Sequence, residues 1–516
     1  MPYTILRSVP SLCNPRLHTF HVKTYDSFEG ISECPRPAEH QDFEEHAIVM
    51  LSRLLKICPE LREFSLGVIP SSVPIVKSVV DACCNFRRLT SFCCGEMTLP
   101  LTFKAITHLA LLPDLQVLMF ASDRSFWTFD DFWLLDHKPK DKIFPSLRNL
   151  GMISSTIDVP LKLLPYVSSR HLEQITIKID GGVPRKRVKP LFGAIADLKG
   201  RRAIEHIHIV MDVLPTNKNS AVTTDGDACP EPISETTLGP LLGLSKLSRL
   251  ILDILCPWSI NDDLLHRMSL VWPNLTVLEL GIERPWPLHK RVQEPGVTLV
   301  GLIVLSHLCE HLHTLGLELT PNVAEVNHSQ GTFPSVFVRL APLENLCVGL
   351  SRIEADEEMA VAGILSNAFP TLKQIDSYWA TLKEEDENRE LEKWREAQGS
   401  QEESVEAGTA FEPDEALVAR WAEYEAMSVK WHEVERTIPE LFLVRTQERR
   451  WNSEHRVYEK AARQVLRDLD VNDEDKMREL VCKYFHEDGW TSYKLRIAFA
   501  MQAAVGLESD HETEPT

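Results

Sequence analysis

The sequence predicts an α/β fold in which one helix–strand unit is repeated many times. A short phrase with the apolar spacing L-x-x-L-x-L recurs through about the first 380 residues. A helix-like segment precedes many copies, and a proline often separates the two, because proline cannot continue a helix. This order of helix, stop and strand is typical of leucine-rich repeats. We therefore expect a solenoid shaped as a horseshoe, with a parallel sheet on the concave side and helices on the convex side.

The best-formed copy of the unit covers residues 272–282. Pro273 ends a helix-like run, and Leu275, Leu278 and Leu280 follow at strand spacing, with Leu278 expected at the buried centre. About twelve copies lie roughly 25 to 44 residues apart. Their first apolar residues are Leu17, Leu61, Leu89, Leu115, Leu147, Leu172, Ile204, Leu247, Leu275, Leu312, Leu343 and Leu372.

Helical segments and insertions divide the predicted solenoid, which spans residues 1–380. Helices are predicted over residues 43–58, 74–86, 262–272, 299–312 and 359–369. Longer insertions are expected at residues 125–142, 215–234 and 282–297. The second of these is rich in Asn, Thr, Asp and Pro, which favours an exposed loop.

The composition changes after Trp379, and the rest of the chain holds most of the net negative charge. Residues 381–412 are acidic and are predicted to be a linker region. Residues 413–451 are predicted to form a capping helix and a closing segment. Residues 452–516 are predicted to be a helical tail, for which the sequence indicates no role.

One stripe of the helix predicted over residues 413–435 is apolar or aromatic. Its most prominent members, Trp421, Tyr424 and Trp431, recur at helical spacing. Such a stripe favours packing against the last repeat as a cap. The alternative is a partner-binding helix that uses the same three aromatic residues.

The bulk composition narrows the classes of partner and location. A formal net charge of −20 argues against nucleic acid as a general partner. The longest apolar run is well short of the roughly 18 residues that cross a bilayer, and the first residues lack a secretory layout, so no membrane association is expected. The 12 cysteines are scattered and are predicted to be reduced thiols. We expect the cytoplasm, the nucleus or both, since Lys186-Arg187-Val188-Lys189 fits a minimal import pattern.

The sequence predicts no catalytic residues, no metal and no cofactor. Side chains between the leucines point to the concave face, where no carboxylate pair or nucleophile–histidine arrangement converges. His206 and His208 could share a metal, but two histidines without a third ligand are more typical of a surface. The adjacent cysteines at 83–84 and 93–94 lack zinc-site spacing and are expected to have structural roles.

These observations predict a non-enzymatic scaffold that binds proteins on its concave face. The candidate patch combines residues of neighbouring strands, and its mixed charge suits a polar protein surface. Its members are His206, His208, Arg249, Glu279 and Thr314. The alternative function is an enzyme with hydrolase-like activity in residues 383–516.

The chain resembles the fungal F-box proteins with degenerate leucine-rich repeats. The resemblance covers about residues 10–451 and depends on four stretches: CPELREFSL at 58–66, FPTLKQI at 369–375, WHEVE at 431–435 and RTQERRW at 445–451. Membership would imply a substrate receptor of a cullin–RING ubiquitin ligase, with the repeats holding the target. The F-box itself, a helical module ahead of the repeats, is not visible. We expect either a missing upstream segment or a repeat-only adaptor without a ligase link.

Overall fold

The structure is a computed structural model of two compact units, Met1–Phe442 and Leu443–Thr516. The boundary lies inside a long C-terminal helix. The structure describes residues 14–22, 37–66, 73–94, 100–122, 133–211, 232–283, 294–324, 326, 341–399 and 411–468.

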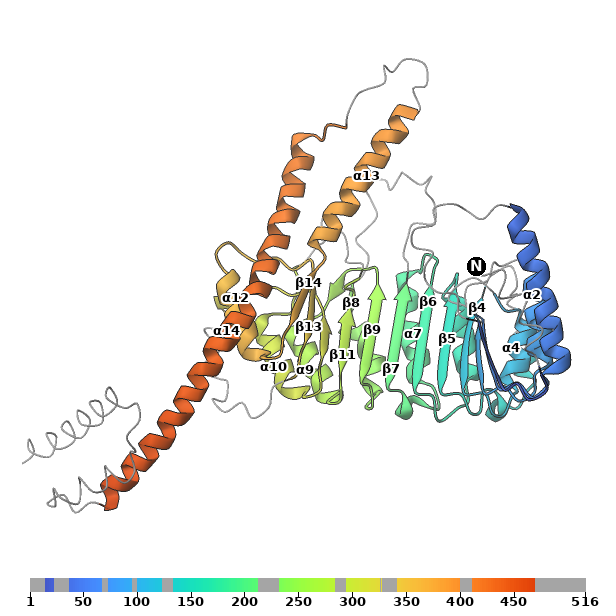
Figure 1. The fold of residues 1–516 in the computed structure, drawn as a ribbon, viewed down its shortest axis with the longest axis horizontal. Coiled ribbons are helices and arrows are strands. Elements are labelled where there is room, and N and C mark those ends of the chain that lie inside the picture. Colours follow the sequence, from blue (N-terminus) through green and yellow to red (C-terminus); the bar gives the residue numbers. More distant parts are fainter. Residues whose placement is uncertain are drawn as a thin grey trace, which may run out of the picture. The chain divides into compact units, whose positions relative to one another are not determined.

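The first unit contains a 12-stranded parallel sheet whose strands follow one another in chain order (Figure 1). The strands are β1 Thr19–Val22, β2 Glu63–Leu66, β3 Ser91–Cys94, β4 Val117–Ser122, β5 Asn149–Ser154, β6 Gln174–Ile179, β7 His206–Met211, β9 Arg249–Ile254, β11 Val277–Leu280, β12 Thr314–Gly316, β13 Asn345–Gly349 and β14 Gln374–Ser377. A two-stranded sheet pairs β8 (Ile233–Ser234) with β10 (Trp258–Ser259). The predicted α/β class is confirmed.

The strand pairing follows the predicted leucine register. Leu278 lies opposite Leu250 on one side and Leu315 on the other. Because strand side chains alternate between faces, this register brings the central leucines of successive units to the same side of the sheet. The pattern read from the sequence therefore places both faces of the sheet correctly.

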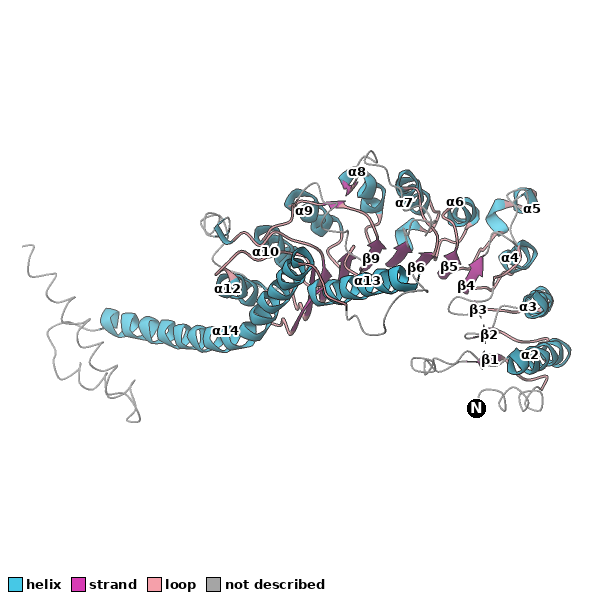
Figure 2. Ribbon diagram, turned by 90° about the horizontal axis from the view of Figure 1, so that it is seen from above, coloured by secondary structure: helices cyan, strands magenta, loops and turns pink. Residues whose placement is uncertain are grey.

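The helices α2–α12 lie along one side of the curved sheet (Figure 2). They are α2 Pro37–Ile57, α3 Val73–Asn85, α4 Phe103–Ala110, α5 Trp133–Asp136, α6 Asp158–Leu163, α7 Val188–Ala196, α8 Glu235–Leu238, α9 Asp262–Val271, α10 Leu299–Leu308 and α12 Glu358–Ala368. All five helices predicted within the solenoid are confirmed, with ends that shift by a few residues. Short 3₁₀ turns join several of them: η3 Lys140–Lys142, η4 Leu164–Tyr166, η5 Arg185–Arg187, η6 Arg201–Ala203 and η7 Gly239–Gly243.

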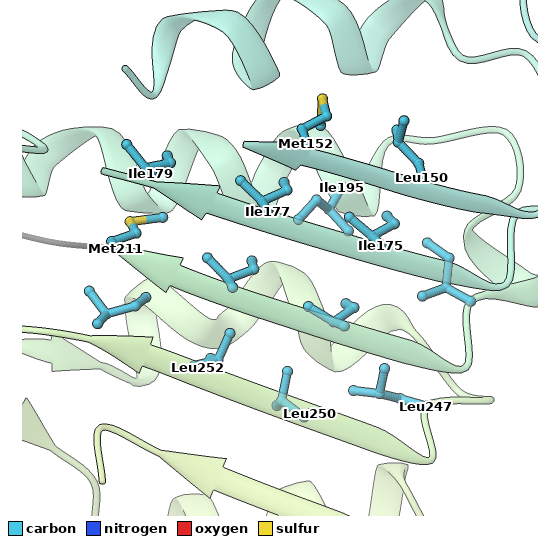
Figure 3. Packing of buried hydrophobic residues seen from close by; sticks show 14 of the residues in the cluster. Leu150, Met152, Ile175, Ile177, Ile179, Ile195, Met211, Leu247, Leu250 and Leu252 are labelled. Carbon is cyan, nitrogen blue, oxygen red and sulfur yellow. The ribbon is translucent and has the colours of Figure 1, made fainter. Parts of the chain in front are cut away.

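The core fills the space between the sheet and these helices. Figure 3 shows Ile175 and Ile177 of β6 and Leu250 of β9 on one side of the sheet, with Ile195 of α7 on that same side. All four side chains are buried. Each unit buries its apolar residues against the next, so the core continues along the sheet.

Side-chain caps join successive helices of the array. The Asn261 side chain accepts a hydrogen bond from the Leu264 amide and begins α9, and Thr298 caps α10 through the Val300 amide. The Thr298 hydroxyl also donates to Asp262 of α9 at 2.7 Å. The same residue therefore starts one helix and ties it to the preceding one.

The C-terminal helices differ from the elements predicted for this region. Residues 381–412 are predicted to be a linker, but α13 runs from Trp379 to Gly399. The separate helices predicted after residue 413 are one helix, α14 (Glu415–Asp468), which continues through Pro439. Proline usually ends a helix, but here the helix continues, and Thr437 and Ile438 beside the proline are buried.

Other predictions fall partly or wholly outside the described residues. Of the insertion at 125–142, the structure describes only residues 133–142, which contain α5 and η3. The loop predicted at 215–234 lies mostly outside the described residues, as does the middle of 282–297. The predicted helical tail is described only as far as Asp468.

Candidate functional site

The candidate site lies on the open face, which we define as the side of the 12-stranded sheet opposite helices α2–α12 (Figure 2). The structure brings all five predicted residues to this face. His206, Arg249 and Thr314 fall in one row, in which Val277 of β11 stands between the last two. His208 and Glu279 fall in the next row, separated by Ile251 of β9. Neighbouring strands lie about 4.8 Å apart, so the patch extends continuously over four strands.

Partial burial makes the charges of the patch interact. Arg249 is exposed, while His208 and Glu279 are half-buried. Burial lowers the pKa of His208, and Arg249 adds to this effect while Glu283 opposes it. Burial also raises the pKa of Glu279, with Glu283 adding to the rise and Arg249 opposing it. The three charged neighbours, Arg249, Glu279 and Glu283, therefore act on one another across the strands.

Two glycines make room for acidic side chains on this face. A Cβ at Gly316 would lie 3.1 Å from Cγ of Glu279, and a Cβ at Gly349 would lie 2.9 Å from Cγ of Glu318. Gly349 also has a φ of 56°, which most other residues avoid. The side chain of each glutamate thus lies over the glycine of the next strand.

Cys347 lies among these acidic groups. Burial, with a smaller contribution from the carboxylates of Asp376, Glu279 and Glu283, raises the pKa of its thiol to about 12. A thiol with such a pKa remains protonated near neutral pH, so it is a poor nucleophile and a poor metal ligand.

The candidate patch predicted from the sequence did not include Glu283, Glu318 and Asp376. Asp376 occupies an outward position of the last strand, and the strand period could have added it. Glu283 follows β11 beyond the periodic stretch, where alternation no longer indicates direction. Only the packed structure brings it near Glu279 and His208.

The histidines and cysteines considered as metal ligands do not form a metal site in the described residues. In the described part of the chain, no group of three or more His, Cys, Asp or Glu side chains could hold a metal ion. Cys83 and Cys94 are buried free thiols, and burial raises the pKa of both. Cys84 and Cys93 are half-buried, also with raised pKa values.

The aromatic stripe of α14 covers the last repeat, so the capping interpretation holds for the described residues. The indole N–H groups of Trp379 and Trp431 both donate to the carbonyl of Ser351, at 2.9 and 2.8 Å. The Tyr424 ring lies 5.9 Å from that of Trp379. Trp431 is fully buried and Tyr424 nearly so. These two residues are occupied within the chain, which corrects the alternative of a free partner-binding stripe.

Trp421 belongs to a contact between α13 and α14, which lie side by side here (Figure 1). Its indole N–H donates to the buried carboxylate of Asp386 at 3.1 Å. Arg420 and Arg389 also bind Asp386, at 2.8 and 3.1 Å. The carboxylate is thus satisfied from three sides, as a buried charge requires.

The cap also covers the edge of the sheet. The Glu435 side chain of α14 accepts a hydrogen bond from the Ile375 amide of β14 at 3.2 Å. Unpaired edge amides invite pairing with other chains, and a covering helix prevents this. This contact involves the backbone edge of β14 and not the outward side chains of the open face.

The basic run suggested for nuclear import belongs to the folded part of the chain. Lys186 and Arg187 lie in η5, and Lys189 lies in the first turn of α7. Arg187 forms an ion pair with Asp158, while the two lysines are exposed. Among the helices that the structure describes, none is both long and apolar enough to cross a membrane.

Two comparisons with known proteins found no relative of this chain. A scan against protein-family models and a search of curated proteins both found no match. The function must therefore be inferred from the residues of the open face and from the sequence resemblance.

Proposed function

We propose that this protein is a non-enzymatic interaction scaffold of the leucine-rich-repeat type, and that its open face holds a protein partner. The observation that carries the proposal is the sheet itself. Twelve parallel strands present their outward side chains in continuous rows, and helices α2–α12 lie on the other side. An extended curved surface of this kind suits a large partner better than a small ligand.

The chemistry of the patch supports a polar protein partner. Arg249 supplies an exposed guanidinium, and Thr314 and the two histidines supply hydrogen-bonding groups. Arginine is frequent among the residues that dominate binding energy. The alternative, a hydrolase in residues 383–516, finds less support, because the Trp, Tyr and Asp side chains of α13 and α14 named above are engaged in packing.

The role as a substrate receptor of a cullin–RING ubiquitin ligase is a narrower proposal. It rests on the resemblance to F-box proteins, in which the repeats hold the target. Affinity purification from the native cell would recover ligase subunits together with the target if this role is correct. Recovery of a partner without ligase subunits would favour the repeat-only adaptor.

A double substitution on the open face tests the scaffold proposal. Once a partner has been purified, the variant R249A/E279A should bind it with an affinity lower by more than about 2 kcal/mol, roughly thirtyfold. The physical reason is the loss of a guanidinium and of a half-buried carboxylate from adjacent strands. Titration calorimetry with the purified partner measures the difference.

The matched control is the variant E235A/R267A. These two residues form an exposed ion pair of 2.6 Å between α8 and α9, on the helix-covered side, so the same two residue types are removed. The control should bind with wild-type affinity. If a folded R249A/E279A variant bound the partner with full affinity, the partner would not bind at this part of the open face.

A further inference from the structure

Two stretches of the open face, over β3–β6 and over β11–β14, differ in charge. At the first two outward positions of β3–β6 every side chain is uncharged: Ser91, Cys93, Val117, Met119, Asn149, Gly151, Gln174 and Thr176. Over β11–β14, the outward positions and the residues just after β11 and β12 carry four carboxylates, Glu279, Glu283, Glu318 and Asp376. We call these four residues the acidic strip. Arg249 on β9 marks its border.

The acidic strip extends across adjacent strands of one surface. Asp376 of β14 lies beside Cys347, which lies beside Gly316, which lies beside Glu279. At about 4.8 Å per strand this row is roughly 14 Å long. Three of the carboxylates raise the pKa of the Cys347 thiol, which lies within this row.

Two of the four carboxylates, those of Glu279 and Glu318, are restrained by the neighbouring backbone. Glu279 crosses Gly316, and Glu318 crosses Gly349 and accepts a hydrogen bond from the Leu350 amide at 3.2 Å. Side chains that are already ordered lose little conformational freedom on binding. A ligand that complements them therefore gains affinity from this arrangement.

We propose that the acidic strip binds a segment of the partner protein that carries lysine and arginine side chains. The inference rests on the proposed function and adds the chemistry of the partner. Complementary charge selects the basic segment, because the strip presents four carboxylates beside one exposed guanidinium. The uncharged positions of β3–β6 accept the neighbouring neutral residues of the same partner, including contact with Met119, which is 42 % exposed.

A labelled peptide of four Gly-Lys repeats is the probe, and fluorescence anisotropy with the full chain at low salt is the measurement. The variant E279Q/E283Q/D376N should bind it at least tenfold more weakly than the wild type. The control E45Q/D81N/E310Q removes the same charge at exposed positions away from the open face, and should bind within twofold. The same peptide with every lysine acetylated should bind at least tenfold more weakly to the wild type.

Two outcomes would overturn the inference. Equal losses in both triple variants would mean that the net negative charge attracts the peptide without a defined strip, and equal binding of the acetylated peptide would exclude charge recognition. Should the triple variant fail to fold, E283Q/D376N repeats the test, since both residues are exposed. The proposed function fails by a separate result, an unchanged affinity of the purified partner for R249A/E279A.

Discussion

Replacing Trp431 with alanine should lower the free energy of unfolding of the first unit by about 3–5 kcal/mol, measured by urea denaturation. The indole is fully buried between α14 and the end of the sheet. Its removal leaves a large cavity at the point where the cap meets the last repeat. The Ser351 carbonyl keeps the hydrogen bond from Trp379, so most of the loss comes from the cavity.

Two variants distinguish this effect from a general weakening of α14. Val429 on the same helix is 61 % exposed, and its change to alanine should alter stability by about 0.5 kcal/mol or less. Trp431→Phe retains much of the buried ring volume and should cost clearly less than Trp431→Ala. If Trp431→Ala were as mild as Val429→Ala, the cap would contribute nothing to the stability of the repeats.

The variant Leu278→Ala should lower the free energy of unfolding by about 2–5 kcal/mol in the same assay. Leu278 is completely buried and pairs with Leu250 and Leu315 of the neighbouring strands. Alanine would lose the transfer free energy of the leucine side chain and leave a cavity in a core that both adjacent repeats share.

Thr276 provides the comparison within the same repeat. The sequence predicts an exposed or strand-edge position for Thr276, whose change to alanine would then cost well under 1 kcal/mol. In the structure, however, its hydroxyl donates to the Ser248 carbonyl of the preceding repeat at 2.9 Å. We therefore expect Thr276→Ala to cost about 1 kcal/mol and Thr276→Ser much less. Equal losses for Leu278→Ala and Thr276→Ala would contradict the strand register.

The leucine pattern predicted the strands well because burial on one face imposes a period of two. A shift by one residue would expose every leucine, so the sequence alone specifies which side chains face the helices. This period correctly placed His206, Arg249 and Thr314 in a common row. It could not find Glu283, because a residue after the strand has no periodic neighbour to indicate its direction.

The C-terminal region was predicted less well because its helices depend on distant contacts. The charged composition of α13 resembles a linker, yet Lys383 binds Glu425 of α14 at 2.8 Å and Asp386 binds Arg420. The local sequence around α13 does not indicate that these side chains have partners on α14. The same holds for Glu435, which covers the edge amide of Ile375 from a position 60 residues away.

The sequence by itself determined the α/β class, the strand register and the face on which the candidate residues lie, because periodic burial is a local signal repeated in every unit. Only the tertiary structure decided that the aromatic stripe of α14 is a cap, and that four carboxylates from three repeats form one surface beside Arg249. Those features arise from contacts between segments far apart in the chain, whose partners no local pattern specifies.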